Sequence, residues 1–251
     1  MHYLWLWAFV FAASFYQPNV QTDKIIKVSF DVGGQARTFF LFAPKTAPEA
    51  TAPLMLILHG SGMDGRSLME EWKELAKKEG IILAAPNSLS AGGWSLEHDG
   101  PAFIHKLMAA VKAKHPFDER RVYLFGYSGG AVYALQLSLL ESEYFAATAV
   151  YAGAIDSGSY NRLAQAKRKI PIALFVGTND PFFPIPKVQA TRNLLKQSGF
   201  PVLMKEIFLD EMVHGHDYFS VARTINRHSW NFFKNYKLDA TPTFRRFENN
   251  P

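Results

Sequence analysis

The sequence has no cysteine among its 251 residues, which excludes a disulfide framework, a thiolate nucleophile and a cysteine-ligated metal site. It also lacks long runs of charge of one sign, although the formal net charge is +5. The densest basic stretches are short, at Lys167–Lys169 and Arg245–Arg246. These charges predict a solvated basic surface and no nucleic-acid partner, because nucleic-acid-binding arms need longer basic runs.

Long apolar runs are missing as well. The run Tyr3–Ala13 is too short to span a bilayer comfortably and has the length of a signal-peptide core. Ala12 and Ser14 are small residues at a spacing suited to cleavage, although no Lys or Arg precedes the core. We predict that residues 1–14 are a signal peptide and that the mature protein is secreted or periplasmic, without stable membrane insertion. An uncleaved anchor and a buried amino-terminal segment are the alternatives.

The composition is that of a globular protein, with 48% apolar and 20% charged residues. The length suits one sizeable α/β domain. No later stretch is rich enough in linker residues to divide the chain, so residues 15–251 are predicted to form a single domain.

Eight segments are predicted as strands, from continuous apolar runs or from alternation of apolar and polar residues. They are Ile25–Phe30, Arg37–Phe42, Leu54–Leu58, Ile81–Ala85, Val122–Phe125, Ala147–Tyr151, Pro171–Val176 and Val202–Leu209. Helical spacing is found at Ser67–Lys78, Phe103–Lys114, the segment after Gly130, Lys187–Gln197 and Tyr218–Lys237. This alternation predicts a mainly parallel eight-stranded sheet with helices on both faces, and the first two strands add an antiparallel hairpin at one edge.

The strand Val122–Phe125 stops at Gly126–Gly130, which reads Gly-Tyr-Ser-Gly-Gly, and a helical pattern follows. A strand, a Gly-x-Ser-x-Gly turn and a helix together make up a nucleophile elbow. The glycines let the backbone turn sharply and let the helix pass close to the strand. The pattern predicts Ser128 as an exposed nucleophile at the carboxyl end of its strand.

A serine hydroxyl needs a base, and the base needs an orienting acid. After a nucleophile elbow these follow in the order acid, then histidine. Asp180 lies just past the strand Pro171–Val176, and His216 lies past the last strand. Because parallel strands end at one edge of a sheet, Ser128, Asp180 and His216 are predicted to meet there.

Both partners of the serine have rivals that sequence spacing leaves open. Asp156 follows an earlier strand and is the main rival acid, whereas Asp210 lies too near the last strand. His214 shares a loop with His216, which we favour because it immediately precedes the final helix. Two such histidines could also hold a metal, but the residues that follow bring no third ligand, so no metal is predicted.

Backbone N–H groups usually stabilise the oxyanion that forms in acyl transfer. Gly129, the residue after the nucleophile, is predicted to supply one of them. Ser61, in the glycine turn His59–Gly62, is predicted to supply the other. Hydrolysis by these groups needs no cofactor.

Four aromatic residues fall near this site in the predicted topology. They are Trp94, Tyr127, Phe182 and Phe183. We predict that they form apolar walls of a substrate pocket, with ordinary packing as the alternative for each.

Three segments carry a resemblance to a known group. Leu58–Gly62, Trp94–Asp99 and Phe117–Ala131 are similar to the polyhydroxybutyrate-depolymerase and feruloyl-esterase-like group of secreted serine esterases, within the α/β-hydrolase superfamily. Members share a Gly-x-Ser-x-Gly-Gly elbow preceded by an Asp-x-Arg-Arg-Val strand entry. The resemblance covers nearly the whole mature chain and implies an α/β-hydrolase fold and an esterase that uses Ser128 with its predicted acid and base.

The prediction for function is therefore hydrolysis of a carboxylic ester, as small-molecule substrate, through an acyl-enzyme. Unlike secreted polymer-degrading members of the group, the chain has no cysteine and no appended substrate-binding domain, which favours a smaller or soluble ester. Two alternatives remain. One is a serine peptidase of prolyl-oligopeptidase type, whose propeller domain is missing here, and the other is a non-catalytic binding protein on a hydrolase scaffold.

Overall fold

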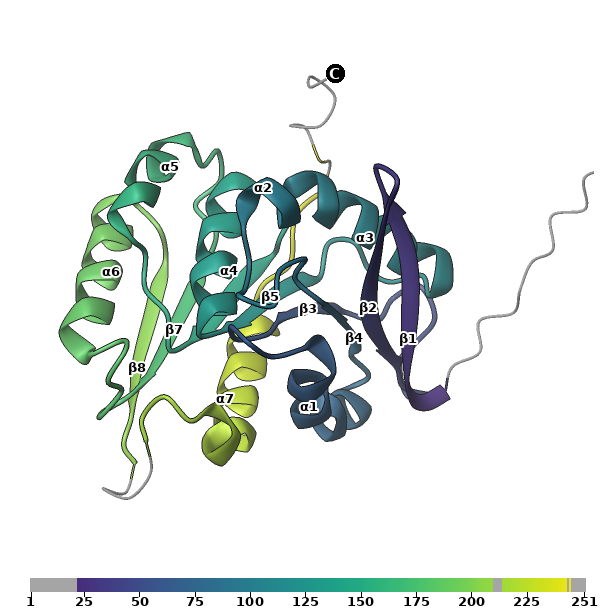
Figure 1. The fold of residues 1–251 in the computed structure, drawn as a ribbon, viewed down its shortest axis with the longest axis horizontal. Helices are drawn as coiled ribbons and strands as arrows, with labels where there is room; N and C mark the ends of the chain where they lie inside the picture. The colour runs from purple at the N-terminus through teal and green to yellow at the C-terminus, as the bar shows by residue number, and fades with distance from the viewer. Residues whose placement is uncertain (1–21, 210–213, 243, 245–251) are drawn as a thin grey trace, which may run out of the picture.

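The computed structural model describes residues 22–209, 214–242 and 244 (Figure 1). The predicted signal peptide and Asp210 lie outside the described residues. Within them, eight strands form one sheet in the order β1-β2-β4-β3-β5-β6-β7-β8. The strands are β1 (Thr22–Val32), β2 (Gln35–Ala43), β3 (Leu54–Leu58), β4 (Ile82–Pro86), β5 (Val122–Tyr127), β6 (Ala147–Tyr151), β7 (Ile172–Gly177) and β8 (Val202–Ile207).

The pairing of the strands confirms the predicted fold class. Strands β1 and β2 form an antiparallel hairpin, and β2 also pairs antiparallel with β4. From β4 across to β8, every neighbouring pair is parallel. The inner strands read as continuous apolar runs because both of their faces are covered, and every residue of β3 and β5 is buried.

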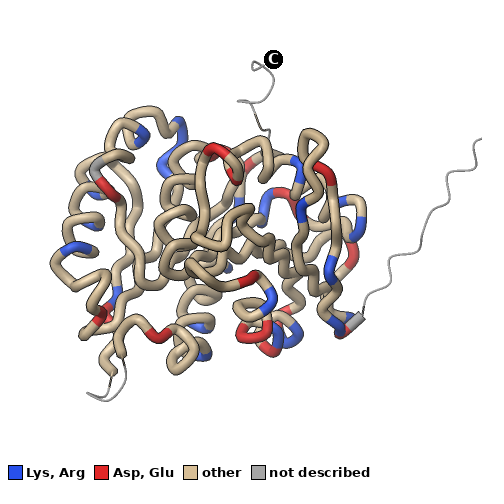
Figure 2. Tube along the Cα trace, in the orientation of Figure 1, with Lys and Arg blue, Asp and Glu red and all other residues tan. Residues whose placement is uncertain are grey.

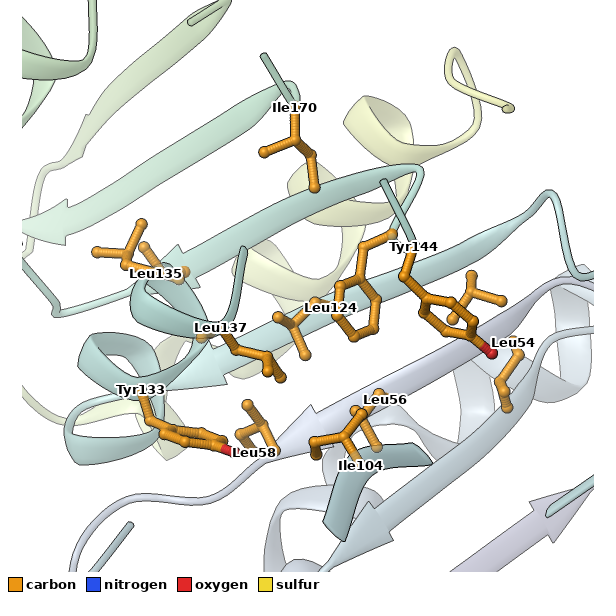
Figure 3. Packing of buried hydrophobic residues seen from close by; sticks show 14 of the residues in the cluster. Leu54, Leu56, Leu58, Ile104, Leu124, Tyr133, Leu135, Leu137, Tyr144 and Ile170 are labelled. Carbon is orange, nitrogen blue, oxygen red and sulfur yellow. The ribbon is translucent and has the colours of Figure 1, made fainter. Parts of the chain in front are cut away.

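Helices cover both faces of the sheet. They are α1 (Gly65–Glu79), α2 (Leu96–Asp99), α3 (Pro101–Lys114), α4 (Gly129–Leu140), α5 (Tyr160–Gln165), α6 (Ile185–Gln197) and α7 (Tyr218–Phe233), with a 3₁₀ turn η1 (Ser157–Ser159). Figure 1 shows α1 and α7 on one face and α3, α4 and α6 on the other. Side chains of β5 alternate between these layers: Leu124 packs in the cluster of Figure 3, whereas Tyr123, Phe125 and Tyr127 pack on the side of α1 and α7.

The predicted elements differ from the structure mainly at their ends. Residues 87–100, for which the sequence predicts neither strand nor helix, contain α2, whose N-cap Ser95 accepts a hydrogen bond from the His98 N–H at 3.2 Å. A single turn is too short to show an apolar period. Strand β8 and helix α7 end earlier than predicted, at Ile207 and Phe233. Strand β8 stops there because its parallel pairing with β7 ends at the same level.

A buried ion pair ties the loop before α3 to strand β2. Arg37 and Asp99 are 3% and 1% exposed, and Arg37 Nη2 lies 2.5 Å from Asp99 Oδ1. The Asp99 carboxylate also accepts N–H bonds from Leu89 and Ser95, both at 3.0 Å. Buried charges are stable only with such partners. The pair therefore fixes the loop that carries Trp94.

Charged residues of both signs are interspersed along the trace in Figure 2. Some of the ion pairs join two exposed side chains, such as Arg66 and Glu70. The absence of a nucleic-acid partner stays a prediction. In the described part of the chain, no helix is both long and apolar enough to cross a bilayer.

Candidate active site

Ser128 alone makes the turn between β5 and α4. Its φ is +54° and its ψ is −120°, a strained conformation for a residue that carries a side chain. The Ser128 N–H donates to Tyr151 O at 3.1 Å, and the Ser128 carbonyl accepts from the Ala131 N–H at 2.9 Å. The surrounding backbone thus holds the serine in place at the carboxyl end of β5.

Two glycines make this turn sterically possible. A Cβ at Gly126 would lie 2.3 Å from Gly130 O, and a Cβ at Gly130 would lie 2.2 Å from Leu58 O. Both clashes are with backbone atoms, so a larger residue at either position would push α4 away from the sheet. The close approach brings the amino terminus of α4, with its free N–H groups, next to Ser128.

Ser128, His216 and Asp180 lie in one hydrogen-bonded line. His216 Nε2 is 2.9 Å from Ser128 Oγ, and His216 Nδ1 is 3.0 Å from Asp180 Oδ2. Ser128 and His216 are half-buried, and Asp180 is 4% exposed. The structure thus brings together three residues from the loops that follow β5, β7 and β8.

The environment of Asp180 keeps its side chain ionised. The backbone N–H groups of Phe182 and Phe183 both donate to Oδ1 at 2.9 Å. Burial on its own raises the pKa of this carboxyl, but the interactions with His216 and the two backbone hydrogen bonds together outweigh burial, and the pKa lies below its usual value. An ionised Asp180 accepts from the Nδ1–H of His216, which leaves the Nε2 lone pair directed at the Ser128 hydroxyl.

The rival acid and base do not join this line. His214 is exposed, and its carbonyl accepts from the Asp217 N–H at 2.8 Å. Asp156 is also exposed, and its carboxylate accepts from the Ser159 hydroxyl at 3.0 Å and from Gln136 at 3.3 Å. Across the described ranges, no three His, Asp or Glu side chains gather in a way that could hold a metal ion.

The two residues predicted as oxyanion donors lie side by side. A Cβ at Gly129 would lie 3.3 Å from Ser61 N and 2.4 Å from Ser61 Oγ. Gly129 is the first residue of α4, so its N–H has no acceptor within the helix. The N–H groups of Ser61 and Gly129, close to Ser128, could stabilise a negative oxygen.

His59 supports the turn that carries Ser61. It is 1% exposed, and burial lowers the pKa of its ring. Its Nε2 accepts from the Ser88 N–H at 3.2 Å, so the ring proton sits on Nδ1, 2.8 Å from Gly60 O. A neutral His59 therefore links two loops at this edge of the sheet.

Phe182 and Phe183, predicted as pocket walls, flank the imidazole of His216. The Phe182 ring centroid lies 4.9 Å from that of His216, and the side chain is 66% exposed. The Phe183 ring stacks on the same imidazole at 5.9 Å and is partly buried. The ring of Tyr127, a third predicted wall residue, lies 5.4 Å from the same imidazole.

Trp94 and Tyr127, the other two predicted wall residues, have their polar atoms bonded to the scaffold. The Trp94 indole N–H donates to His59 O at 2.8 Å. Tyr127 is 8% exposed, and its hydroxyl donates to His216 O at 2.9 Å. The sequence shows two aromatic residues near the site but contains no signal for these partners, which lie in distant loops.

A cavity of about 1200 Å³ lies along α3, lined in part by Pro101, His105 and Phe117. Its lining includes none of the residues gathered around Ser128. A ligand held there would not contact the hydrogen-bonded line.

Comparison with known proteins finds similarity to a hydrolase family and to proteins named as esterases. Residues 96–216, which are 121 of the 251 residues and just under half, match the model of the Dienelactone hydrolase family. The bifunctional acetylxylan esterase/xylanase XynS20E of Neocallimastix patriciarum is 28% identical over 152 residues, 59% of this chain and 22% of that protein. NocK, a proposed esterase of Nocardia uniformis subsp. tsuyamanensis, is 30% identical over 168 residues, 61% of this chain and 48% of that protein. The chain therefore spans less than half the length of each relative.

Solved structures share the fold. A ferulic acid esterase superposes with a TM-score of 0.65 at 16% identity, over 84% of this chain and 98% of that chain. The chain therefore has the α/β-hydrolase fold. Its relatives in sequence carry the names of esterases, and the matching family model is that of a hydrolase family, in the same direction as the resemblance of its motifs.

Proposed function

We propose that the protein is a carboxylic ester hydrolase that works through an acyl-enzyme on Ser128. The observation that carries the proposal is the hydrogen-bonded line from Asp180 through His216 to Ser128, with distances of 3.0 and 2.9 Å. The esterase names of the sequence relatives support the same reaction.

In the first half of the reaction, Ser128 Oγ attacks the ester carbonyl carbon while His216 Nε2 takes the hydroxyl proton. The carbonyl oxygen becomes negative, and the N–H groups of Ser61 and Gly129 donate to it. The bond to the leaving alkoxide then breaks, and His216 returns its proton to that oxygen. An alcohol leaves, and the acyl group stays on Ser128.

The second half repeats these steps with water. His216 Nε2 takes a proton from the water, whose oxygen attacks the acyl carbon, and the proton then passes to Ser128 Oγ as the carboxylic acid leaves. Asp180 stays ionised throughout and stabilises the imidazolium that forms twice. The strained Ser128 backbone holds Oγ in one position for both halves.

A fluorophosphonate probe tests this proposal, because it forms a covalent bond with an activated serine and releases fluoride. We expect the added mass on the peptide that contains Ser128, together with loss of p-nitrophenyl acetate hydrolysis. An unlabelled protein that still hydrolyses the ester would contradict the role of Ser128, and an unlabelled inactive protein would favour the non-catalytic alternative. Faster cleavage of a peptide p-nitroanilide than of the matched ester would favour a peptidase.

The proposed function also includes export of the protein from the cytoplasm. We propose that the chain is cleaved near Ser14, that residues 15–251 act as one domain outside the cytoplasm, and that the substrate is a small or soluble ester. Amino-terminal sequencing of exported protein tests the cleavage, and an intact Met1 there contradicts it.

Phe182→Ala is expected to change the preference for acyl length. Phe182 presents an exposed ring next to His216, where the acyl chain of a bound ester could pack. Burial of one methylene contributes about 0.8 kcal/mol, so we expect the butyrate-to-acetate ratio of kcat/KM to fall about three- to tenfold. The measurement uses p-nitrophenyl esters of both acids.

The control for this experiment is Leu203→Ala. Leu203 is 46% exposed on edge strand β8, at the level of Ala173 on β7 and far from the carboxyl end of that strand. We expect it to leave the ratio unchanged. The same ratio in Phe182→Ala and in the wild type would remove Phe182 from the pocket.

A further inference from the structure

The base of the proposed triad comes from a distant strand. Ser128 follows β5, whereas the loop of His216 follows β8, and β6 and β7 lie between these two strands. The histidine loop must therefore return across β7. It does so at Gly177, the last residue of β7, where a Cβ would lie 2.3 Å from Gly215 O. Further contacts must then hold the loop at the distance from β5 that lets His216 reach Ser128.

Two tyrosine hydroxyls hold it. The Tyr127 hydroxyl donates to His216 O at 2.9 Å, and the Tyr151 hydroxyl donates to Gly215 O at 2.6 Å. The two acceptors are consecutive carbonyls of the loop. The backbone of the base is thus held by one hydrogen bond from β5 and one from β6.

The same two tyrosines are joined to the nucleophile. Tyr127 directly precedes Ser128 in the chain, and Tyr151 O accepts the Ser128 N–H at 3.1 Å. Tyr127 and Tyr151 are register partners in the β5–β6 pair, with ring centroids 6.2 Å apart. Each tyrosine therefore connects the backbone of Ser128 to the backbone of the histidine loop.

The environment makes this connection rigid. Tyr127 is 8% exposed and Tyr151 is fully buried. The Tyr218 ring packs against both, at 5.2 and 6.0 Å. Burial raises the pKa of Tyr127 to about 12 and also raises the pKa of Tyr151, so both hydroxyls stay protonated donors in the neutral range.

We propose that Tyr127 and Tyr151 are positioning residues that set the distance between His216 Nε2 and Ser128 Oγ by bridging the nucleophile turn to the histidine loop. The inference rests on the proposed function. Proton transfer from Ser128 needs this distance to stay near 2.9 Å, and small misplacements of a catalytic group reduce the rate steeply. Neither tyrosine touches the reacting atoms in this role.

The test compares three Tyr→Phe variants that each lose one buried hydroxyl. Tyr127→Phe and Tyr151→Phe break the bridge. Tyr123→Phe is the matched control, because Tyr123 lies on β5, packs on the same face and donates to Tyr236 O at 2.8 Å, away from the site. We expect kcat for p-nitrophenyl acetate to fall about tenfold in each bridge variant and to stay within about twofold in the control. KM should change little in all three.

Two further measurements separate positioning from loss of stability. Thermal unfolding should show similar shifts in the three variants, since each loses one buried hydrogen bond. The rate of fluorophosphonate labelling of Ser128 should fall in the two bridge variants alone. The proposal is overturned if kcat and labelling in the bridge variants match those of Tyr123→Phe.

Failure of the proposal and failure of the proposed function give different results. A fully active Ser128→Ala variant would contradict the function itself. Bridge variants with wild-type kcat beside an inactive Ser128→Ala would contradict the bridge alone. If one bridge variant does not fold, the other decides the outcome, because each hydroxyl holds a different carbonyl.

Discussion

Replacing Ser128 with alanine is expected to lower kcat for p-nitrophenyl acetate by about 10⁴- to 10⁶-fold. The substitution removes the atom that would carry the acyl group, so neither half of the proposed reaction can proceed. His216 and the proposed oxyanion donors would remain, and groups of this kind account for the small activity that such variants retain. The assay is release of p-nitrophenol by protein purified from cells that lack other esterases.

A serine of helix α4 provides the control. Ser138 lies on α4, is fully buried, and its Oγ is 2.6 Å from both Thr148 Oγ1 and Ala134 O. Ser138→Ala should lower the unfolding temperature but leave kcat within about twofold, because the lost bonds are structural. Residual activity above about one per cent in Ser128→Ala, well above the expected range, would contradict the nucleophile assignment.

The parts of the site that could be predicted from sequence are those that local pattern and strand direction determine. The elbow is contiguous in sequence, and its glycines are required by contacts between neighbouring elements, as at Gly130 and Leu58 O. The positions of Asp180 and His216 could be predicted because parallel strands end at the same edge of the sheet. The alternation of strands and helices in the same way predicted the α/β fold that the strand pairing confirms.

The parts that could not be predicted depend on contacts between distant residues. His214 and His216 share one loop, and only the path of that loop over Gly177 and its bonds to the tyrosines bring His216 to Ser128. The ion pair of Arg37 and Asp99 joins residues 62 positions apart. Neither the path of the histidine loop nor this ion pair leaves a periodic pattern or a motif in the sequence.

The hydrogen-bond partners of the buried aromatic residues could not be predicted from the sequence either. Strand periodicity places Tyr127 in a buried strand, but it does not say where the hydroxyl finds its acceptor. That acceptor is 89 positions away, at His216 O. Trp94 likewise bonds to His59 O, 35 positions earlier. A buried tyrosine or tryptophan must place its polar atom on a partner, and the partner is a property of the fold.

Asp180→Asn is expected to lower kcat by about 10⁴-fold. An amide can donate to His216 Nδ1 where the carboxylate accepts, so the imidazole would take the tautomer that carries its proton on Nε2, facing Ser128. In that form it cannot accept the serine proton. The control is Asp156→Asn, which changes the rival carboxylate and should leave kcat within about twofold, because the Asp156 carboxylate accepts from Ser159 and Gln136, away from the line. Equal losses in the two variants would contradict the assignment of Asp180.

The same substitution should also change how stability depends on pH. Burial raises the pKa of Asp180, but its interactions with His216 and the hydrogen bonds from Phe182 and Phe183 together outweigh burial, so the pKa in the folded protein is lower than its usual value. A lowered folded pKa contributes stability above about pH 4, and that contribution is lost as pH falls through the folded value. The amide of the variant cannot ionise, so the difference in unfolding temperature between wild type and Asp180→Asn should be largest near neutral pH and should shrink towards about pH 2. Thermal unfolding followed by circular dichroism across that range measures it, and a difference that stays constant with pH would show that the ionised carboxylate does not stabilise the fold.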